Sequence, residues 1–247
     1  VDSNNTPVDF SYWPFGELHT TKVNNNDATL VTMAYDTLGR KTSLNDPNTG
    51  TITYTYNALD LLATQVDAKG QRTCYRYDAL GRQTGRVDLA NASCSGANSQ
   101  QWVYDTRTYG KGQLASLTGV NSDGSSFSET YTYTNYSLPQ TTTTTFDGSS
   151  YALTQYYDGF NRPIGVKYPT NYVAANDYNE YGQLAQVSDS TGAILWAAND
   201  SDSLGNVTQF TLGNGVVTTQ TYDVNTQRID TIRAVKGGLV IQDQDYG

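Results

Sequence analysis

Hydrophobic and polar residues alternate with a period of two over several short stretches of the chain. The clearest are TITYTYN at 51–57 and ETYTYTN at 129–135, in which aromatic residues and threonine take alternate positions. This is the period of a β-strand, whose successive side chains point to opposite faces of the sheet. Asn, Asp and Gly, which favour turns, follow these stretches. The pattern predicts many short strands, each with an aromatic face and a hydroxylated face, joined by tight turns.

One phrase recurs along the chain, most clearly as YDTLGRKT at 35–42 and YDALGRQT at 77–84. Its first Tyr serves as an anchor, and ten anchors stand at positions 12, 35, 56, 77, 104, 133, 157, 178, 201 and 222, all Tyr except Ser201. Their spacings are 23, 21, 21, 27, 29, 24, 21, 23 and 21 residues. About 21 residues accommodate two strands and two turns. We therefore predict that residues 1–247 form a single repeat region of about ten β-hairpins, whose longer intervals contain inserted loops.

Each position of the phrase suits a hairpin turn. The Asp or Asn after the anchor can accept hydrogen bonds from backbone N–H groups of the turn, and the Gly four residues after it tolerates a positive φ. An apolar or aromatic residue stands between them, and Arg follows in the clearest copies. The motif residues are Tyr35, Asp36, Leu38, Gly39, Arg40, Tyr56, Asn57, Leu59, Tyr77, Asp78, Leu80, Gly81, Arg82, Tyr157, Asp158, Phe160, Arg162, Tyr178, Asn179, Tyr181 and Gly182.

The predicted fold class is all-β, with consecutive antiparallel hairpins side by side in one strip. About twenty strands at about 4.8 Å each make a ribbon on the order of 95 Å wide. A twisted sheet of that width does not stay flat, so we expect the strip to curl or spiral. The alternative is a β-propeller, since two hairpins of this length would make one four-stranded blade.

Composition and charge exclude some functions. The net charge is −9 and no cluster of Lys or Arg exists, which argues against nucleic-acid binding. No apolar stretch is long enough to span a bilayer. The repeated Asp–Arg pairs favour structural bracing, because an active site is not copied several times in one chain. His19 is the only histidine, so we predict no catalytic residue, no metal site and no cofactor.

Two further groups of residues leave alternatives open. Cys74 and Cys94 lie 20 residues apart and form either a disulfide or two free thiols. Trp13, Trp102 and Trp196 could stack on sugar rings, although aromatic residues in a regular repeat more often pack within the sheet. Carbohydrate binding or adhesion through exposed Tyr and Trp is therefore the alternative function.

The phrases YDTLGR, YDALGR, YDGFNR and YNEYGQ resemble the YD repeats of the Rhs-repeat family, from about Phe10 to Tyr246. That family includes bacterial Rhs proteins, the C component of Tc toxins and the teneurins. The resemblance implies a hollow β-sheet shell that encloses a C-terminal toxin domain or presents it, in a secreted or cell-surface bacterial protein. We expect this chain to be an internal section of such a shell, without the toxin and without the segment that closes the shell. Its expected partners are the remaining repeats and toxin domain of the parent protein, or further copies joined through open strand edges; glycans are the alternative partner.

Overall fold

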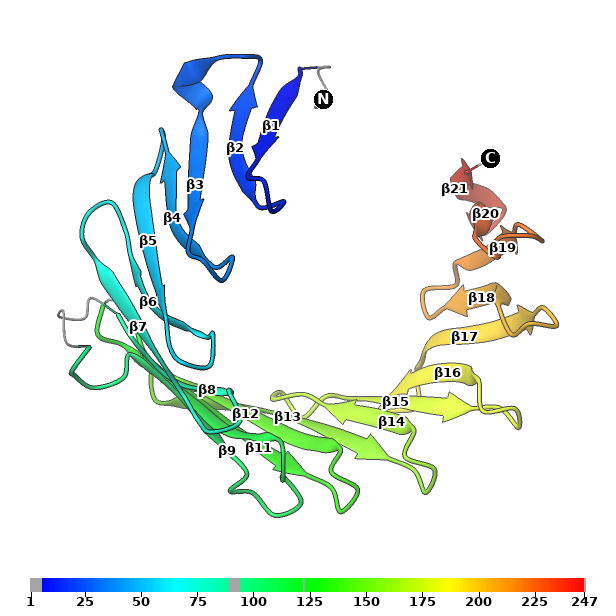
Figure 1. The fold of residues 1–247 in the computed structure, drawn as a ribbon. Coiled ribbons are helices and arrows are strands. Elements are labelled where there is room, and N and C mark those ends of the chain that lie inside the picture. The colour runs from blue at the N-terminus through cyan, green and yellow to red at the C-terminus, as the bar shows by residue number, and fades with distance from the viewer. Residues whose placement is uncertain (1–5, 89–93, 122, 247) are drawn as a thin grey trace. The chain divides into compact units, whose positions relative to one another are not determined.

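The computed structural model describes residues 6–88, 94–121 and 123–246, which form 21 β-strands and one 3-10 helix, η1 (Asp27–Thr29) (Figure 1). The chain divides into two compact units. The first comprises the residues up to Thr106 together with Gly110–Glu129, and the second comprises Arg107–Tyr109 together with the residues from Thr130 onward. Among the described residues, no helix has the length and apolar character needed to cross a membrane.

The first unit consists of short strands in chain order. They are β1 (Val8–Tyr12), β2 (Leu18–Val23), β3 (Val31–Tyr35), β4 (Lys41–Asp46), β5 (Gly50–Tyr56), β6 (Leu62–Val66), β7 (Arg72–Tyr77), β8 (Gln83–Val87), β9 (Gln100–Tyr104) and β10 (Leu114–Val120). The next strand, β11 (Ser126–Tyr133), contains the division between the units.

The second unit repeats the same plan. Its strands are β12 (Pro139–Phe146), β13 (Ser149–Tyr157), β14 (Pro163–Lys167), β15 (Val173–Tyr178), β16 (Leu184–Asp189), β17 (Ile194–Ser201), β18 (Val207–Leu212), β19 (Val217–Tyr222), β20 (Ile229–Lys236) and β21 (Leu239–Asp245).

Within each unit, every strand pairs antiparallel with the next strand in the chain. The pairing is unbroken from β1 to β10 and again from β12 to β21. A propeller blade would end after four strands, so the propeller alternative is wrong. The predicted all-β fold of consecutive antiparallel hairpins is confirmed.

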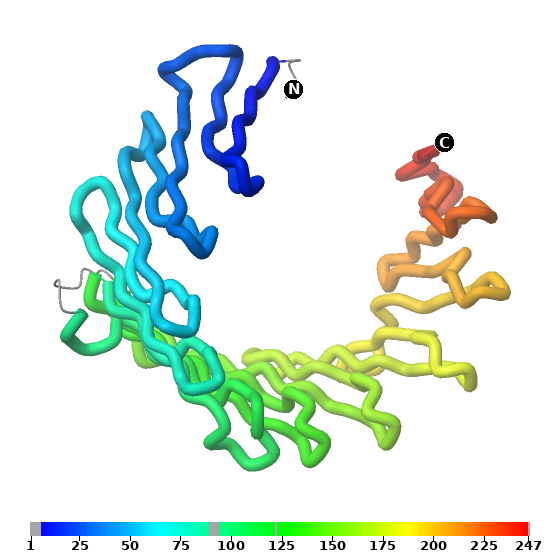
Figure 2. Tube along the Cα trace, viewed as in Figure 1, coloured from blue at the N-terminus to red at the C-terminus, as the bar shows by residue number. Residues whose placement is uncertain are grey.

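All ten anchors are the last residues of odd-numbered strands, from Tyr12 at the end of β1 to Tyr222 at the end of β19. In most hairpins the register shifts just before the anchor, for example between Arg76 and Tyr77 and between Tyr156 and Tyr157. Such a bulge bends the strand and redirects the side chain that follows it. We call the turn after each anchor the YD turn. Because the anchors end the odd-numbered strands, the YD turns of each unit lie at the same end of its strands (Figure 2).

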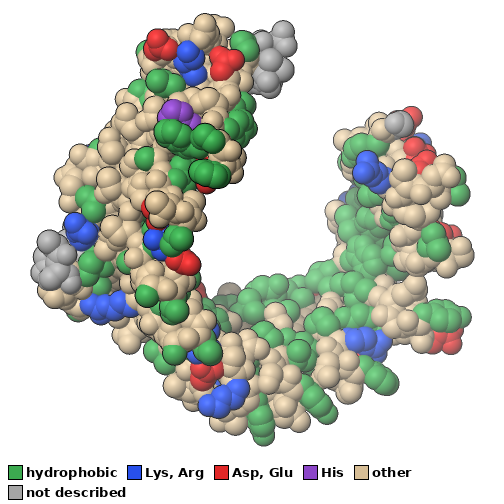
Figure 3. Space-filling model, in the orientation of Figure 1, with side chains coloured by type: hydrophobic (Ala, Val, Ile, Leu, Met, Phe, Trp, Pro, Cys, Tyr) green, Lys and Arg blue, Asp and Glu red, His purple; other side chains and the backbone are tan. Residues whose placement is uncertain are grey.

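The sheet is a single layer with few fully buried side chains. Among the described residues, the buried hydrophobic residues are Met33, Cys74, Val87, Ala115, Tyr133, Val216 and Ala234. Strand β5 shows the predicted alternation, because its Thr side chains are exposed whereas Tyr54 and Tyr56 are half-buried. Figure 3 shows hydrophobic side chains at the surface of both units. Each hairpin must therefore obtain its stability from its neighbours, as in other repeat proteins.

Candidate functional site

The backbone of the YD turn is held by the side chain that follows the anchor. Oδ1 of Asp78 accepts hydrogen bonds from the backbone N–H groups of Leu80 and Arg82, both at 2.9 Å. The N–H of Gly81 donates to the carbonyl of Asp78, and the φ of Gly81 is 78°. A positive φ at this position is cheapest for Gly, Asn and Asp. The same Asx contacts recur at Asp36, Asn57, Asp158, Asn179 and Asp202.

The anchor tyrosine links its hairpin to the preceding one. The hydroxyl of Tyr77 donates to the carbonyl of Leu62, the first residue of β6, at 2.8 Å. The ladder between β6 and β7 ends at Thr64 and Cys74, so the tyrosine ring closes the space between the strands near the YD turn. Five other anchors donate to the first carbonyl of the corresponding strand: Tyr35 to Leu18, Tyr56 to Lys41, Tyr157 to Pro139, Tyr178 to Pro163 and Tyr222 to Val207.

The motif arginine links its hairpin to the following one. Nε of Arg82 donates to Oδ2 of Asp78 at 2.7 Å, and Nη2 donates to Oδ2 of Asp105, in the next YD turn, at 2.5 Å. The guanidinium also lies 4.4 Å from the centre of the Tyr104 ring, where a cation is attracted to the ring face. The sequence predicted the contact between Asp and Arg within one turn. The structure adds a second contact, from the same Arg to the neighbouring repeat.

Two other arginines make corresponding links. Arg40 pairs with Asp36 and with Asp60 of the next turn, and lies over the ring of Tyr56. Arg162 pairs with Asp158 and lies over the ring of Tyr178. The sequence analysis missed the role of Asp60. The available signal was an acidic residue in the position where half of the copies have Gly, one repeat after an Arg.

The carboxylates of these turns are committed to structural contacts. The guanidinium of Arg82, followed by the N–H of Gly112, lowers the pKa of Asp105 to about 2. The N–H of Arg40 makes the largest contribution to the lowered pKa of Asp36, and the Arg40 guanidinium lowers it further. A carboxyl group held ionised in this way is a poor general base, because a base works best with a pKa near the working pH.

The three tryptophans differ in exposure. Trp13 is 43% exposed and its ring packs at a tilt against His19, with 4.1 Å between ring centres. Trp102 and Trp196 are half-buried, and Trp196 packs beside Phe210. The structure thus places one of the three, Trp13, where a ligand can reach a large part of the ring.

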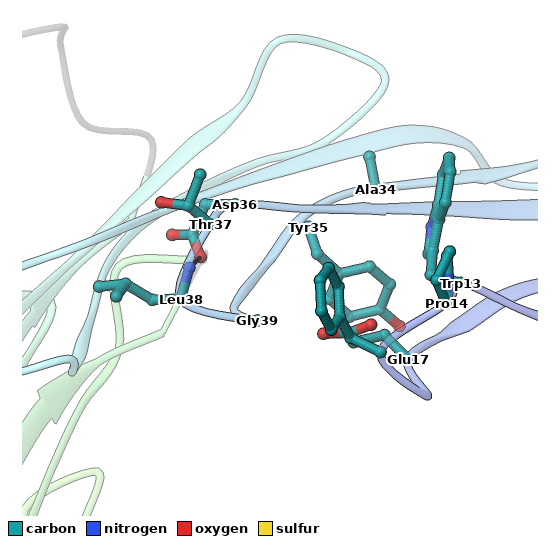
Figure 4. A pocket seen from close by; sticks show the side chains of 10 residues that line it. Trp13, Pro14, Glu17, Ala34, Tyr35, Asp36, Thr37, Leu38 and Gly39 are labelled. Atoms are coloured by element: carbon teal, nitrogen blue, oxygen red, sulfur yellow. Dashed lines mark hydrogen bonds between the residues drawn. The ribbon is translucent and has the colours of Figure 1, made fainter.

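Trp13 lines a cavity of about 750 Å³ between the first two YD turns, which we call the Trp13 groove. Figure 4 shows Trp13 and Pro14 at one side of the groove, with Tyr35 and Glu17 next to each other. Phe15 and Leu38, which belong to the two YD turns and are largely exposed, also line it. The groove therefore combines aromatic surface with two carboxylates, those of Glu17 and Asp36, as many ligand sites combine apolar surface with a few polar groups.

The structure joins Cys74 and Cys94 in a disulfide, with their Cα atoms 5.8 Å apart. Cys74 is buried in β7, and Cys94 lies between β8 and β9. Arg76, also on β7, donates to the carbonyls of Cys94 and Gly96. These contacts attach the inserted segment to the sheet. Among residues 6–88, 94–121 and 123–246, no group of three or more His, Cys, Asp or Glu could hold a metal ion.

These features define a repeat protein of edge-to-edge hairpins. The RHS Repeat family model matches residues 35–72 and 56–92, which contain the YD turns after Tyr35, Tyr56 and Tyr77. Residues 35–92 therefore match the Rhs repeat, and the resemblance predicted from the YD phrases is confirmed. Comparison with curated proteins gives no match.

Solved structures of Tc toxins have a similar fold. The crystal structure of TcdB2-TccC3 matches with a TM-score of 0.71 at 15% identity, covering 98% of this chain and 14% of the matched chain. A Photorhabdus luminescens Tc holotoxin pore matches with a TM-score of 0.70 at 16% identity, covering 97% and 13%. TcdB2-TccC3 without its hypervariable C-terminal region also matches, with a TM-score of 0.70 at 15% identity, covering 98% and 13%. The chain thus spans about one seventh of the matched chain's length and shares its β-sheet fold.

Proposed function

We propose that this chain is a section of a passive β-sheet shell, which encloses or presents a toxin domain of the same parent protein. The observation that carries the proposal is the pair of links at the YD turns after Tyr35, Tyr77 and Tyr157. Tyr77 bonds to the preceding hairpin and Arg82 to the following one, so these side chains of the repeated motif serve to join hairpins. A wall built in this way needs no reaction of its own.

The likeness to Tc toxin structures supports this proposal. The match is retained in TcdB2-TccC3 without the hypervariable C-terminal region, so the shared part is the β-sheet fold. The repeated Asp–Arg pairs support a non-enzymatic role, because their carboxyl groups are held ionised by backbone N–H groups and guanidinium groups. The further partners we propose are other repeats and a toxin domain of the parent protein.

The disulfide supports a location outside the cytoplasm. Disulfides such as Cys74–Cys94 persist in oxidising surroundings and are rare in reducing ones. The acidic net charge of −9 also argues against nucleic acid as a partner. We therefore propose a secreted or cell-surface bacterial protein.

Limited proteolysis of the complete parent protein tests the shell. The complete reading frame that encodes these repeats would be expressed, and the protease sensitivity of the segment after the repeats would be compared with that of the same segment expressed alone. We expect strong protection in the parent protein, and loss of protection in a Tyr77→Ala, Tyr157→Ala double variant that loosens the links between hairpins. Equal sensitivity in all three samples, or a reading frame with no further domain, would contradict the proposal.

A second function, carbohydrate binding, is favoured by the Trp13 groove. Aromatic rings beside a carboxylate suit a sugar, whose C–H face stacks on the ring while its hydroxyls donate to the acid. Trp13, Phe15 and Glu17 supply these groups in one cavity. Screening on a glycan array tests this reading. Binding that is lost on Trp13→Ala and kept on Trp102→Ala would support it, whereas no binding, or equal loss in both variants, would contradict it.

A further inference from the structure

One repeat lacks the anchor tyrosine. Ser201 ends β17 at the position that Tyr157 occupies in β13 and Tyr178 in β15. The ladder between β16 and β17 reaches only Gln186 and Ala197, so the strands are unpaired toward the YD turn, as in the other repeats. In six other repeats the anchor tyrosine reaches across this space to the preceding strand, and a serine side chain is far too short to do so.

A cavity lies at this place. It measures about 670 Å³ and is lined by residues of both YD turns and both strands, including Leu184, Ala198, Ser201 and Leu204. The corresponding cavity at Tyr157, in the same unit, measures about 380 Å³, and the Trp13 groove at Tyr35 measures about 750 Å³; both have the anchor tyrosine in their walls. The space at Ser201 is within the range of small-molecule sites.

The other repeats show which chemical group this space accepts. In six of them a phenol ring lies between the strands, and its hydroxyl donates to the first carbonyl of the preceding even-numbered strand. At Ser201 the equivalent acceptor is the carbonyl of Leu184, the first residue of β16, and Leu184 lines the cavity. Six tyrosine side chains of the protein itself thus show how a phenol ring is bound at this position of a repeat.

The charges around the cavity restrict the ligand further. Asp200 and Asp202 line it, and the pKa of Asp202 is lowered, first by the side chain of Asn206, so this carboxyl group is ionised near neutral pH. A neutral phenol is compatible with these negative charges, whereas a phenolate or an aryl phosphate would be repelled by them.

We propose that the cavity beside Ser201 binds a phenolic ring, inserted between β16 and β17 with its hydroxyl donating to the carbonyl of Leu184. The ring can belong to a free small phenol or to a tyrosine side chain of a partner polypeptide. The proposal does not depend on the function proposed above.

Ligand-detected NMR with p-cresol, the tyrosine side-chain analogue, tests the site on the full chain. We expect saturable binding with a dissociation constant in the millimolar range, about tenfold weaker binding of toluene, and no binding of p-tolyl phosphate. Ser201→Tyr fills the cavity with the protein's own ring and should abolish p-cresol binding. Ser201→Phe fills it without a hydroxyl and should abolish binding as well, so a fold defect in one variant does not decide the result.

The controls separate the alternatives. Circular dichroism verifies that both variants keep the β-sheet. N-acetyl-tyrosine amide in place of p-cresol tests whether a peptide-borne ring can enter; its failure beside successful p-cresol binding assigns the site to small phenols. No saturable p-cresol binding, or binding that survives in Ser201→Tyr and Ser201→Phe, would overturn the proposal.

Discussion

Two repeats of the second unit, one with the full motif and one with a reduced motif, show which residues make the turn and which join the hairpins. The repeat at Tyr157 has Asp158 and Arg162, whereas the repeat at Ser201 has Asp202 and Asn206. In both, the Asp accepts hydrogen bonds from two backbone N–H groups of its turn at 2.8–2.9 Å. The YD turn therefore forms without the tyrosine and without the arginine.

The links between hairpins differ between the two repeats. The hydroxyl of Tyr157 bonds to Pro139 of the preceding hairpin, a link for which Ser201 is too short. Asn206 still bridges Asp202 and Gln227 of the next turn, as a neutral counterpart of Arg40, which bridges Asp36 and Asp60. Asx and Gly thus determine the local turn, and Tyr and Arg determine how hairpins are joined.

The largest difference should appear when both anchors are changed to alanine. Tyr157→Ala removes a half-buried ring and a hydrogen bond, and we expect it to lower the free energy of unfolding by about 2 kcal/mol. Ser201→Ala removes almost nothing and should change it by less than about 0.5 kcal/mol. Urea denaturation followed by circular dichroism measures both. Equal effects of the two substitutions would show that the anchor does not join the hairpins.

Restoring the anchor should narrow the difference between the repeats. Ser201→Tyr places a ring in the cavity between β16 and β17, with its hydroxyl near the carbonyl of Leu184. We expect the free energy of unfolding to rise by about 1 kcal/mol, from buried apolar surface and one hydrogen bond. Ser201→Phe is the matched control and should stabilise less. A chain destabilised by Ser201→Tyr would show that the bulged strand β17 rejects the ring.

The hydroxyl of the anchor should account for a smaller part of the link. Tyr157→Phe should cost about 1 kcal/mol at pH 7, the usual value of one hydrogen bond. Burial raises the pKa of Tyr157 above its ordinary value. The hydroxyl therefore stabilises the fold fully below pH about 10, and this contribution is lost as the pH rises through the folded-state pKa. The difference between Tyr157→Phe and the unaltered chain should shrink in alkaline solution, and a constant difference from pH 7 to 11 would contradict this.

The arginine link should have the smallest effect. Arg82→Gln keeps hydrogen bonding but removes the charge, and it should destabilise less than Tyr157→Phe, because partly exposed ion pairs are screened by solvent. The pKa of Asp105, about 2, lies below its unfolded value, so the pair stabilises the fold above pH about 4 and ceases to do so as the pH falls through 2. Urea denaturation should show a clear difference between Arg82→Gln and the unaltered chain at pH 7 and a much smaller one at pH 2, where much of the Asp105 carboxyl group is protonated even in the folded chain. An equal difference at both pH values would rule out the ion pair as its cause.

Local features of this fold could be predicted from the sequence, and contacts between repeats could not. Asp36 and Gly39 form a turn through hydrogen bonds within five residues, and the strand ending at Tyr35 follows from the period of two. The target of the Tyr77 hydroxyl depends on the register between β6 and β7, which no residue of the motif determines. The exposure of Trp13 and the partial burial of Trp102 likewise depend on which hairpins surround them. The sequence shows that Ser201 replaces the anchor tyrosine. That this replacement lies beside a cavity could be recognised only once the structure showed where the other anchor tyrosines lie.

The tyrosine contacts the preceding hairpin in the chain and the arginine contacts the following one, so the repeat has a direction. When a complete unit of about 21 residues is duplicated or deleted in the gene, the tyrosine contact and the arginine contact can both form again between the new neighbours. Neither contact can form after the loss of half a unit. Evolution can therefore widen or narrow such a sheet only in whole hairpins, in steps of about 10 Å.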